Sequence, residues 1–264
     1  MTKVLHISDL HFGAVDPRLP DRLLALSNLL APDAVVVSGD LTQRARPGQF
    51  AAARDLLRHL ELPVLAVPGN HDIPLFNLPL RLLAPFRRHA GSFGALEPGL
   101  SLPGAVIQGV NTANPLAWKS GRLRAASARH LAAAFAAAPA DAWRIAVMHH
   151  APVPAADGTP ADITDPAGVL ARLAEAGAQI VLSGHTHMPH AGLAEAAAGI
   201  LFVQVGTAIS TRLKTDANDV SLLEITAGAL TLRSWLARPG QAFTECPPSH
   251  FRRAGKVWTA LSGG

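Results

Sequence analysis

The sequence predicts a mixed α/β protein, in which strand–helix units typical of a parallel sheet come first and antiparallel strands follow. Three observations support this fold class: short apolar runs rich in Val and Ile, amphipathic segments between these runs, and a later change of pattern. The chain has 264 residues, of which 49% are hydrophobic and 16% are charged. This composition excludes a disordered chain, and the length corresponds to one or two domains at about 150 residues each.

Five apolar runs are each too short for an independent helix, and their Val and Ile content is typical of buried strands. They cover residues 4–8, 34–38, 64–67, 145–148 and 180–183. Between these runs lie segments whose apolar residues recur at intervals of three and four, which predicts helices. The predicted helices cover residues 21–30, 49–60 and 166–176.

The second half of the chain changes pattern. Apolar runs at 200–206, 220–226 and 229–235 follow one another, and the last two flank Ala227-Gly228. This arrangement predicts a hairpin and therefore antiparallel strands. We assign residues 1–238 to one domain and residues 239–264 to a C-terminal extension. Prolines are frequent over 73–104, where we expect an irregular insertion near the functional site.

Charge and hydropathy exclude several classes of protein. No apolar run approaches the ~20 residues that span a bilayer, and the N-terminal apolar stretch is too short and too polar for a signal peptide. The single cysteine, Cys246, fits a reducing compartment, so we expect a cytoplasmic protein. The net charge of +4 arises from scattered Lys and Arg residues, so we do not expect a nucleic acid as partner.

Side chains of the types that bind metals follow each of the five apolar runs, where the predicted strand ends. These residues are Asp9 and His11, Asp40, Asn70 to Asp72, His149 and His150, and His185 and His187. Because the carboxyl ends of parallel strands meet at one edge of a sheet, we expect these side chains to converge. Asp, Asn and His bind divalent ions such as Mn, Fe, Zn or Co, and so large a set suits two adjacent ions that share a carboxylate.

Five motifs occur in a fixed order along the chain. They are Asp9-Leu10-His11, Gly39-Asp40, Gly69-Asn70-His71-Asp72, Met148-His149-His150 and Gly184-His185-Thr186-His187. This ordered set resembles the calcineurin-like metallophosphoesterase family. The SDLHFG sequence at 8–13 and HHAP at 149–152 are similar to the bacterial cyclic-nucleotide phosphodiesterase-like branch of that family. The resemblance implies two stacked mixed β-sheets flanked by helices, which agrees with the strand pattern.

The resemblance also implies a role for each motif residue. One divalent ion would be held by Asp9, His11 and His187, and a second by Asn70, His149 and His185. Asp40 would bridge the two ions, and His71 would act on the substrate without binding metal. Residues 1–238 would then form the catalytic domain.

Several residues near the motifs are open to more than one interpretation. Arg44 stands where related protein phosphatases have a phosphate-binding arginine, but those enzymes have an acidic residue where this chain has Gln43. Arg44 and Asn111 are candidate substrate contacts, and Asn111 fits a plain turn equally well. His150 is expected to point away from His149, because a strand alternates faces. The histidines that lack a motif are expected on the surface: His59, His89, His130 and His250.

We therefore expect a dimetal-dependent phosphodiesterase that acts on a small-molecule phosphate ester, either a cyclic nucleotide or a small linear diester. A metal-bridging hydroxide would attack phosphorus in line, and His71 would protonate the leaving oxygen or donate a hydrogen bond to it. Phosphomonoesterase activity, or nucleotide-sugar or lipid pyrophosphatase activity, is the alternative, decided by the loops at 73–104 and 111–124. A metal-bound scaffold without catalysis is a further alternative, against which the presence of His71 argues. A homodimer is compatible with the sequence.

Overall fold

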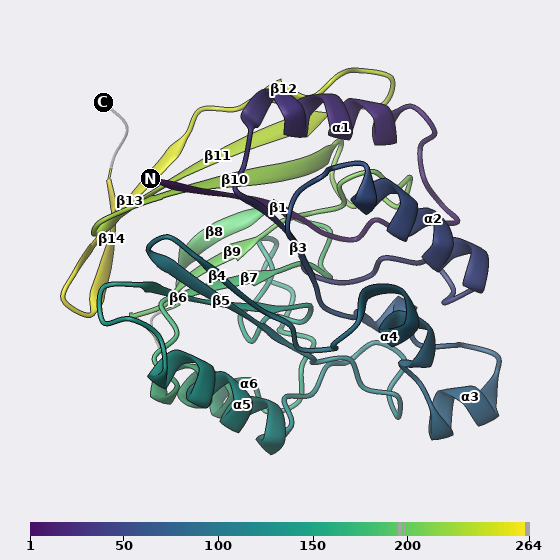
Figure 1. Ribbon diagram of the computed structural model, residues 1–264, viewed down its shortest axis with the longest axis horizontal. Helices are drawn as coiled ribbons and strands as arrows, with labels where there is room; N and C mark the ends of the chain where they lie inside the picture. Colours follow the sequence, from purple (N-terminus) through teal and green to yellow (C-terminus); the bar gives the residue numbers. More distant parts are fainter. Residues whose placement is uncertain (195–196, 198, 262–264) are drawn as a thin grey trace.

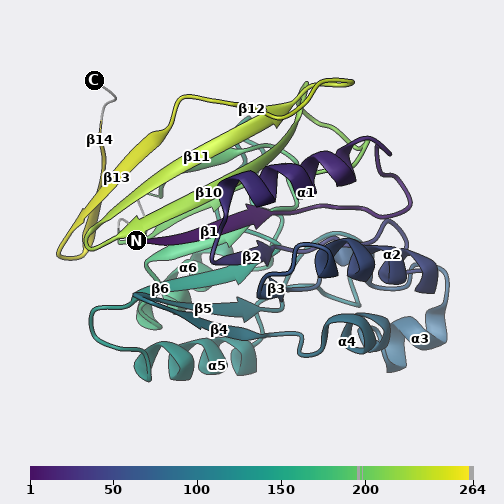
Figure 2. The ribbon, with the colours of Figure 1, turned by 45° about the horizontal axis from the view of Figure 1, so that its top comes forward.

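The computed structural model describes residues 1–194, 197 and 199–261. Two mixed β-sheets lie face to face, and helices cover the outer face of each sheet, so that the protein has four layers (Figure 1; Figure 2). This arrangement confirms the predicted fold class of two stacked mixed sheets flanked by helices.

The first sheet has the strand order β14-β13-β11-β10-β1-β2-β3, with the short strand β12 paired to β11. Its parallel part consists of β1 (Thr2–Ile7), β2 (Ala34–Val37) and β3 (Val64–Ala66). Antiparallel strands continue the sheet from the other edge of β1. They are β10 (Asn218–Thr226), β11 (Ala229–Ala237), β12 (Thr244–Glu245), β13 (Ser249–Ala254) and β14 (Val257–Leu261). The predicted hairpin around Ala227-Gly228 is confirmed as the β10–β11 pair.

The second sheet has the strand order β4-β5-β6-β7-β9-β8. Its central strands are parallel: β5 (Ala105–Val110), β6 (Trp143–Met148), β7 (Ile180–Ser183) and β9 (Leu201–Gln204). The edge strands β4 (Gly99–Leu102) and β8 (His190–Leu193) pair antiparallel to their neighbours. The run at 200–206 thus forms a buried parallel strand of the second sheet rather than a neighbour of β10, and the antiparallel hairpin begins only afterwards.

Helices α1 (Leu19–Leu30) and α2 (Pro47–Arg58) cover the first sheet, whereas α5 (Ala125–Ala136) and α6 (Pro166–Glu175) cover the second. Two short helices, α3 (Leu78–Leu83) and α4 (Arg87–Phe93), follow β3. The segment 73–104, expected to be irregular, therefore contains α3, α4 and β4. Over the ranges that the structure describes, no helix is long and apolar enough to cross a membrane.

The covered faces explain why the central strands are mainly apolar. On β1, Val4 packs between the two sheets, whereas Leu5 and Ile7 pack against the layer of α1 and α2. A sheet that is covered on both faces needs apolar residues at consecutive positions of its central strands. The loops that follow these strands are the nearest places for polar side chains, so ligand-type residues occur where the strands end.

Residues 239–261 belong to the same stack of sheets. β13 and β14 extend the first sheet, and Phe251 and Trp258 are buried between the two sheets. The Trp258 ring stacks on that of Trp143, with centroids 5.0 Å apart, and thereby ties the C-terminal hairpin to β6. The domain boundary after residue 238 and a separate role for 239–264 stay predictions.

The expectation that His89 lies on the surface is wrong. His89 is completely buried on α4, against Phe50 at 6.4 Å and Phe93 at 5.4 Å between ring centroids. A seven-residue helix is too short to show its buried face as a sequence pattern. Because burial disfavours the charged imidazolium, the pKa of His89 is lowered to about 4. His59 and His130 are exposed as expected, and His250 is half-buried.

We expect the substitution His89→Leu to reduce the acid sensitivity of the fold. The unfolded chain protonates this residue near pH 6.5, whereas the folded protein resists protonation down to about pH 4, so the free energy of unfolding falls as the pH is lowered through this window. At pH 4.5 the free energy of unfolding is lower by about 2.5 kcal/mol because of His89. Urea titrations at pH 7 and pH 4.5 should therefore show a smaller loss of stability in the variant. His130→Leu, on the exposed surface of α5, is the control, and an unchanged loss in His89→Leu would contradict the prediction.

Candidate metal centre

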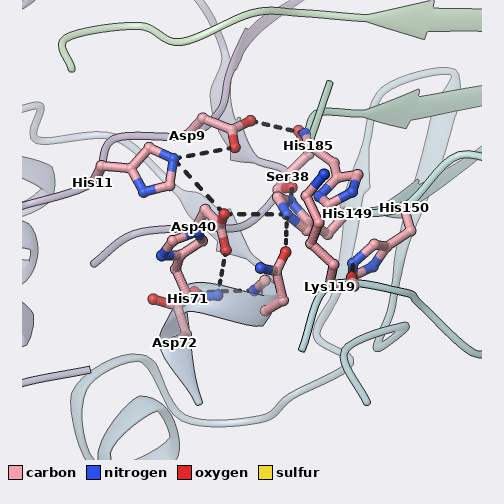
Figure 3. A network of polar contacts seen from close by, with 12 residues as sticks. Asp9, His11, Ser38, Asp40, His71, Asp72, Lys119, His149, His150 and His185 are labelled. Carbon is pink, nitrogen blue, oxygen red and sulfur yellow. Dashed lines mark hydrogen bonds and ion pairs between the residues drawn. The ribbon is translucent and has the colours of Figure 1, made fainter. Parts of the chain in front are cut away.

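The predicted ligand residues follow strands of both sheets, and the structure brings them together (Figure 3). Asp9 and His11 follow β1, Asp40 follows β2, Asn70 begins a short 3₁₀ helix after β3, His149 follows β6, and His185 and His187 follow β7. The sequence argument expected one sheet edge. Because the two sheets are stacked with the ends of their parallel strands adjacent, each sheet contributes part of the cluster.

Asp9, His11 and His187 form one group of buried side chains. The Nε2 atoms of His11 and His187 lie 3.1 Å apart, and Oδ1 of Asp9 lies 3.1 Å from Nε2 of His187 and 3.6 Å from Nε2 of His11. Oδ1 of Asp9 accepts no hydrogen bond from the part of the chain that the structure describes. A buried carboxylate oxygen without a donor, facing two imidazole nitrogens, is an arrangement that a cation would complete.

Asp40, Asn70 and His149 form a second group. Oδ2 of Asp40 lies 3.4 Å from Nε2 of His149 and 3.7 Å from Nε2 of His11, so this carboxylate lies between the two groups. Nε2 of His149 lies 3.2 Å from Oδ1 of Asn70, and the His185 ring packs edge-on against that of His149, with centroids 5.1 Å apart. The Asp40 carboxylate is therefore close to residues of both groups.

The separations fit ligand atoms that share an ion. Two atoms that each lie about 2.1 Å from a metal are about 3.0 to 3.4 Å apart in octahedral or tetrahedral coordination. The closest pairs in the two groups are separated by 3.1, 3.2 and 3.4 Å. The donors are imidazole nitrogens and carboxylate or amide oxygens without a thiolate, which suits Mn, Fe, Zn or Co.

The electrostatics of the cluster favour cations. Burial alone lowers the pKa of His149, but the adjacent Asp40 carboxylate outweighs burial and raises this pKa to about 9. For Asp40 the two effects have opposite signs. Burial raises the pKa of this carboxyl group, but the positive charge of His149 outweighs burial, and the pKa of Asp40 lies well below its usual range. Buried carboxylates thus hold protons on neighbouring histidines, and a divalent ion would displace those protons.

Five of the predicted ligands share an uncommon backbone conformation. Asp9, His11, Asp40, His185 and His187 have φ angles between 46° and 71°. This left-handed region is sparsely populated by residues other than glycine, and each such residue costs of order 1–3 kcal/mol. Such strain clusters at functional sites, where the surrounding structure holds side chains in a required orientation.

Three of the predicted ligand histidines each have one ring nitrogen fixed by a hydrogen bond, which would leave the other nitrogen for a metal. The bonds are His149 Nδ1 to the Ser38 carbonyl (2.8 Å), His187 Nδ1 to the Arg212 carbonyl (2.6 Å) and His185 Nε2 to the Asp162 carboxylate (3.0 Å). Asp162 lies in the loop between β6 and α6, outside every sequence motif, so the sequence gave no signal for it.

His150 has no ring nitrogen free for a metal. Its Nδ1 is 2.9 Å from Oγ1 of Thr112, and its Nε2 donates to the Lys119 carbonyl at 2.8 Å. Its ring lies edge-on to that of His149, with centroids 4.7 Å apart. The expectation that His150 points away from His149 is therefore wrong, because β6 ends at Met148 and the alternation of a strand no longer applies. His150 connects the loop after β5 to the metal-ligand cluster.

Asp72 ties two loops of the site together. Its buried carboxylate accepts hydrogen bonds from the backbone N–H groups of Leu41 (3.2 Å), Thr42 (2.9 Å) and Gly69 (3.0 Å). These bonds join the loop after β2 to the loop after β3. Asp72 thereby fixes the spacing between the segments that carry Asp40 and His71.

His71 lies beside the cluster, with its ring centroid 4.8 Å from that of His11. Its backbone N–H donates to Oδ1 of Asp40 at 2.8 Å, and its Nδ1 donates to the Gln43 carbonyl at 2.9 Å. Since Nδ1 carries that proton, Nε2 is the acceptor for Nη1 of Arg212, 3.1 Å away. Burial lowers the pKa of His71.

A cavity of about 240 Å³ opens onto the cluster. Its lining residues are Asp40, Asn70, His71, Lys119, His185, His187, Arg212, Leu213 and Lys214. A neighbouring cavity of about 260 Å³ shares three of these residues and adds Arg44 and Trp118. The candidate contact Arg44 thus lies next to the metal-ligand cluster. The sequence did not indicate Lys119, Arg212 or Lys214, because they lie in loops that carry no motif.

Asn111 lines neither cavity. It is buried, and its Oδ1 accepts a hydrogen bond from the backbone N–H of Ala113 at 3.0 Å. This is the local turn that asparagine side chains commonly stabilise. The expectation of a substrate contact at Asn111 is therefore not supported, and the turn interpretation describes the residue.

Motif glycines let the ligand turns pack closely. A Cβ atom on Gly69 would overlap Oδ1 of Asp40, and a Cβ atom on Gly184 would overlap Oδ2 of Asp9 and Oγ of Ser8. The backbone N–H of the residue after Gly184 also donates to Oδ2 of Asp9, at 3.0 Å. Glycine at both positions is thus required by close approach to a carboxylate ligand.

We expect Gly184→Ala to weaken metal binding by about 10- to 100-fold, the range seen when groups that orient a ligand are lost. The added Cβ must displace the Asp9 carboxylate from its position beside His11 and His187. Calorimetric titration of the metal-free protein with Mn²⁺ or Zn²⁺ measures the effect. Gly91→Ala is the matched control, because a Cβ there meets no atom within 4 Å. Equal affinities in both variants would contradict the expected displacement.

Comparison with known proteins agrees with this geometry. A 78-residue stretch is 41% identical to a glycerophosphodiester phosphodiesterase of Enterobacter lignolyticus, covering 25% of this chain and 28% of that protein. Over 201 residues the chain is 30% identical to a cAMP/cGMP dual specificity phosphodiesterase of Mycobacterium tuberculosis, covering 70% of this chain and 61% of the relative. The matches thus span less than two thirds of the length of either relative.

The fold resembles that of solved structures at low sequence identity. A dimetal phosphatase from Danio rerio has a TM-score of 0.64 and 13% identity, covering 93% of this chain and 98% of that one. Vps29 from Chaetomium thermophilum has a TM-score of 0.55 and 14% identity, covering 96% and 100%. The family model described as calcineurin-like phosphoesterase matches residues 2–189, which include all five motifs and all seven predicted ligands. The chain therefore belongs to the calcineurin-like phosphoesterase family.

Proposed function

We propose that this protein is a dimetal-dependent phosphodiesterase that hydrolyses a small-molecule phosphodiester. The observation that carries the proposal is the convergence of the predicted ligands around Asp40, beside a cavity that is lined by four of them, by His71 and by three cationic side chains. Phosphoryl transfer needs such a combination of metal ligands, a proton-carrying group and positive charge for the phosphate.

The proposed site holds two divalent ions. Asp9, His11 and His187 would bind one, Asn70, His149 and His185 would bind the other, and Asp40 would bridge them. Two such ions supply Lewis-acid chemistry, since they lower the pKa of water and stabilise negative charge on the phosphoryl oxygens. Mn, Fe, Zn and Co all suit these donors.

The protein's own residues would bind and orient the ester. Lys119, Arg212 and Lys214 place positive charge around the cavity and attract the phosphate. His71 lines the cavity and its Nδ1 is fixed on the Gln43 carbonyl, so Nε2 is the atom that would hold the proton or hydrogen bond for the leaving oxygen. Among the described residues that line the cavity there is no Ser, Thr or Cys, which supports direct displacement without a covalent intermediate on such a side chain.

The names of the relatives support a diester substrate. Both curated relatives described above are phosphodiesterases, one for glycerophosphodiesters and one for cyclic nucleotides. The ligand cluster itself would serve a monoester or a pyrophosphate equally well, so the choice among substrates depends on the residues around the cavities, such as Trp118 and Lys119.

The test is a substrate comparison with the metal-reconstituted protein. Cyclic AMP, bis(4-nitrophenyl) phosphate, 4-nitrophenyl phosphate and a nucleotide sugar would be assayed together, after elemental analysis has established two ions per chain. We expect higher kcat/KM for a diester than for the monoester. A strong preference for the monoester or the nucleotide sugar would replace the proposal with a phosphatase or pyrophosphatase. A protein with two ions and no turnover of any ester would indicate a scaffold.

A further inference from the structure

Two arginine side chains gather around His71 and Gln43. Nη1 of Arg44 donates to the Gln43 carbonyl at 3.1 Å and lies 3.4 Å from Nδ1 of His71. Nη1 of Arg212 donates to Oε1 of Gln43 at 3.0 Å and to Nε2 of His71 at 3.1 Å. Two guanidinium groups from distant parts of the chain therefore share the same two neutral neighbours.

Neither arginine has a carboxylate partner among the salt bridges of the described residues. The lysine in the same cavity differs, because Nζ of Lys119 lies 4.0 Å from the Asp162 carboxylate. In the described ranges only Nη1 of each guanidinium is hydrogen-bonded to protein, so the Nε and Nη2 donors of both remain for a ligand. Two adjacent guanidinium groups without a counter-ion are suited to bind a phosphate.

Gln43 explains why Arg212 has no counter-ion at this position. A glutamate at this position would place a carboxylate oxygen 3.0 Å from Nη1 of Arg212, whereas the glutamine accepts the same hydrogen bond without neutralising the charge. The amide thus positions Arg212 and leaves its positive charge for a ligand.

We propose that Arg44 and Arg212 bind a second phosphate group of the substrate, on the leaving-group side of the bond that is hydrolysed. The proposal rests on the proposed function, because it takes the metal centre as the place of the reacting phosphate and His71 as the leaving-group side. Both arginines contact His71. The two cavities that they line share His71 and the candidate ligand Asn70. The substrate class is then a diester whose leaving alcohol carries a second phosphate. A cyclic mononucleotide has no such group.

A binding experiment tests this assignment without turnover. Methylphosphonate and methylenediphosphonate differ by one phosphonate group, and calorimetric titration of the metal-reconstituted protein gives a dissociation constant for each. We expect the wild type to bind the diphosphonate about 10- to 100-fold more tightly, the range for charge-assisted hydrogen bonds. Arg212→Gln and the near-isosteric Gln43→Glu should each lose most of this advantage. Arg46→Gln is the control, because it removes an exposed charge outside both cavities. This variant should still bind the diphosphonate more tightly than the monophosphonate.

The outcomes separate this inference from the proposed function. If Arg212→Gln and Gln43→Glu weaken both phosphonates equally, the arginines hold the reacting phosphate and the inference is wrong. An advantage that persists in both variants, with metal content unchanged, also overturns it. The wild type is assayed for ester hydrolysis in parallel. Absence of hydrolysis refutes the proposed function, whereas an active wild type that binds both phosphonates equally refutes only the second-phosphate site.

Discussion

Asp40→Ala is expected to lower kcat/KM by at least about 10³-fold, more than loss of a ligand to one ion, because a bridging carboxylate serves both ions. Oδ2 of Asp40 lies 3.4 Å from Nε2 of His149 and 3.7 Å from Nε2 of His11, so it belongs to both ligand groups. Its Oδ1 also accepts the backbone N–H of His71 at 2.8 Å. The substitution therefore removes a ligand, a buried negative charge and a fixed position for His71.

Asn70→Ala provides the comparison. Asn70 contacts only the second group, through its Oδ1 at 3.2 Å from Nε2 of His149, so we expect a smaller loss. Both variants would be assayed at saturating Mn²⁺, with elemental analysis of bound metal and circular dichroism as a check on folding. If Asn70→Ala is inactive while Asp40→Ala retains substantial activity, Asp40 is not the bridge.

The clustering of the candidate ligands could be predicted because two simple constraints act on these residues. Buried strands such as β1 and β2 are mainly apolar on both faces, with His6 as the buried exception on β1, so polar residues such as Asp9 and Asp40 stand out where each strand ends. The fixed order of the five motifs along the chain then supported the family resemblance. The sequence could not show that β3 and β7 lie in different sheets, because residues 64–67 and 180–183 are alike in length and composition.

The charged residues around the cavity could not be predicted for a physical reason. Lys119 lies between β5 and α5, Asp162 between β6 and α6, and Arg212 between β9 and β10. Loops impose no periodicity on their side chains, so nothing distinguishes these residues from solvated charges until the chain folds. The same holds for His89, whose burial depends on the contact between α4 and α2.

His71→Ala is expected to retain two metal ions and to lose activity according to the leaving group. His71 contacts Asp40 through its backbone N–H, which alanine preserves, so the ligand cluster should stay intact. General acid catalysis is typically worth about 10²–10⁴-fold, and we expect a loss of this size for an alkyl diester. A nitrophenyl diester needs little protonation, because nitrophenolate leaves readily, and its loss should be smaller.

The contacts of Nε2 allow the comparison of the two diesters to distinguish proton donation by His71 from a positioning role. Nδ1 is committed to the Gln43 carbonyl, so a proton for the leaving oxygen must sit on Nε2, where Arg212 now donates. Burial lowers the pKa of His71, which makes its protonated form a stronger acid. If instead Nε2 only accepts from Arg212 and thereby positions it, His71→Ala should lower activity equally on both diesters. Loss of a metal ion from the variant would contradict both roles and make His71 a ligand.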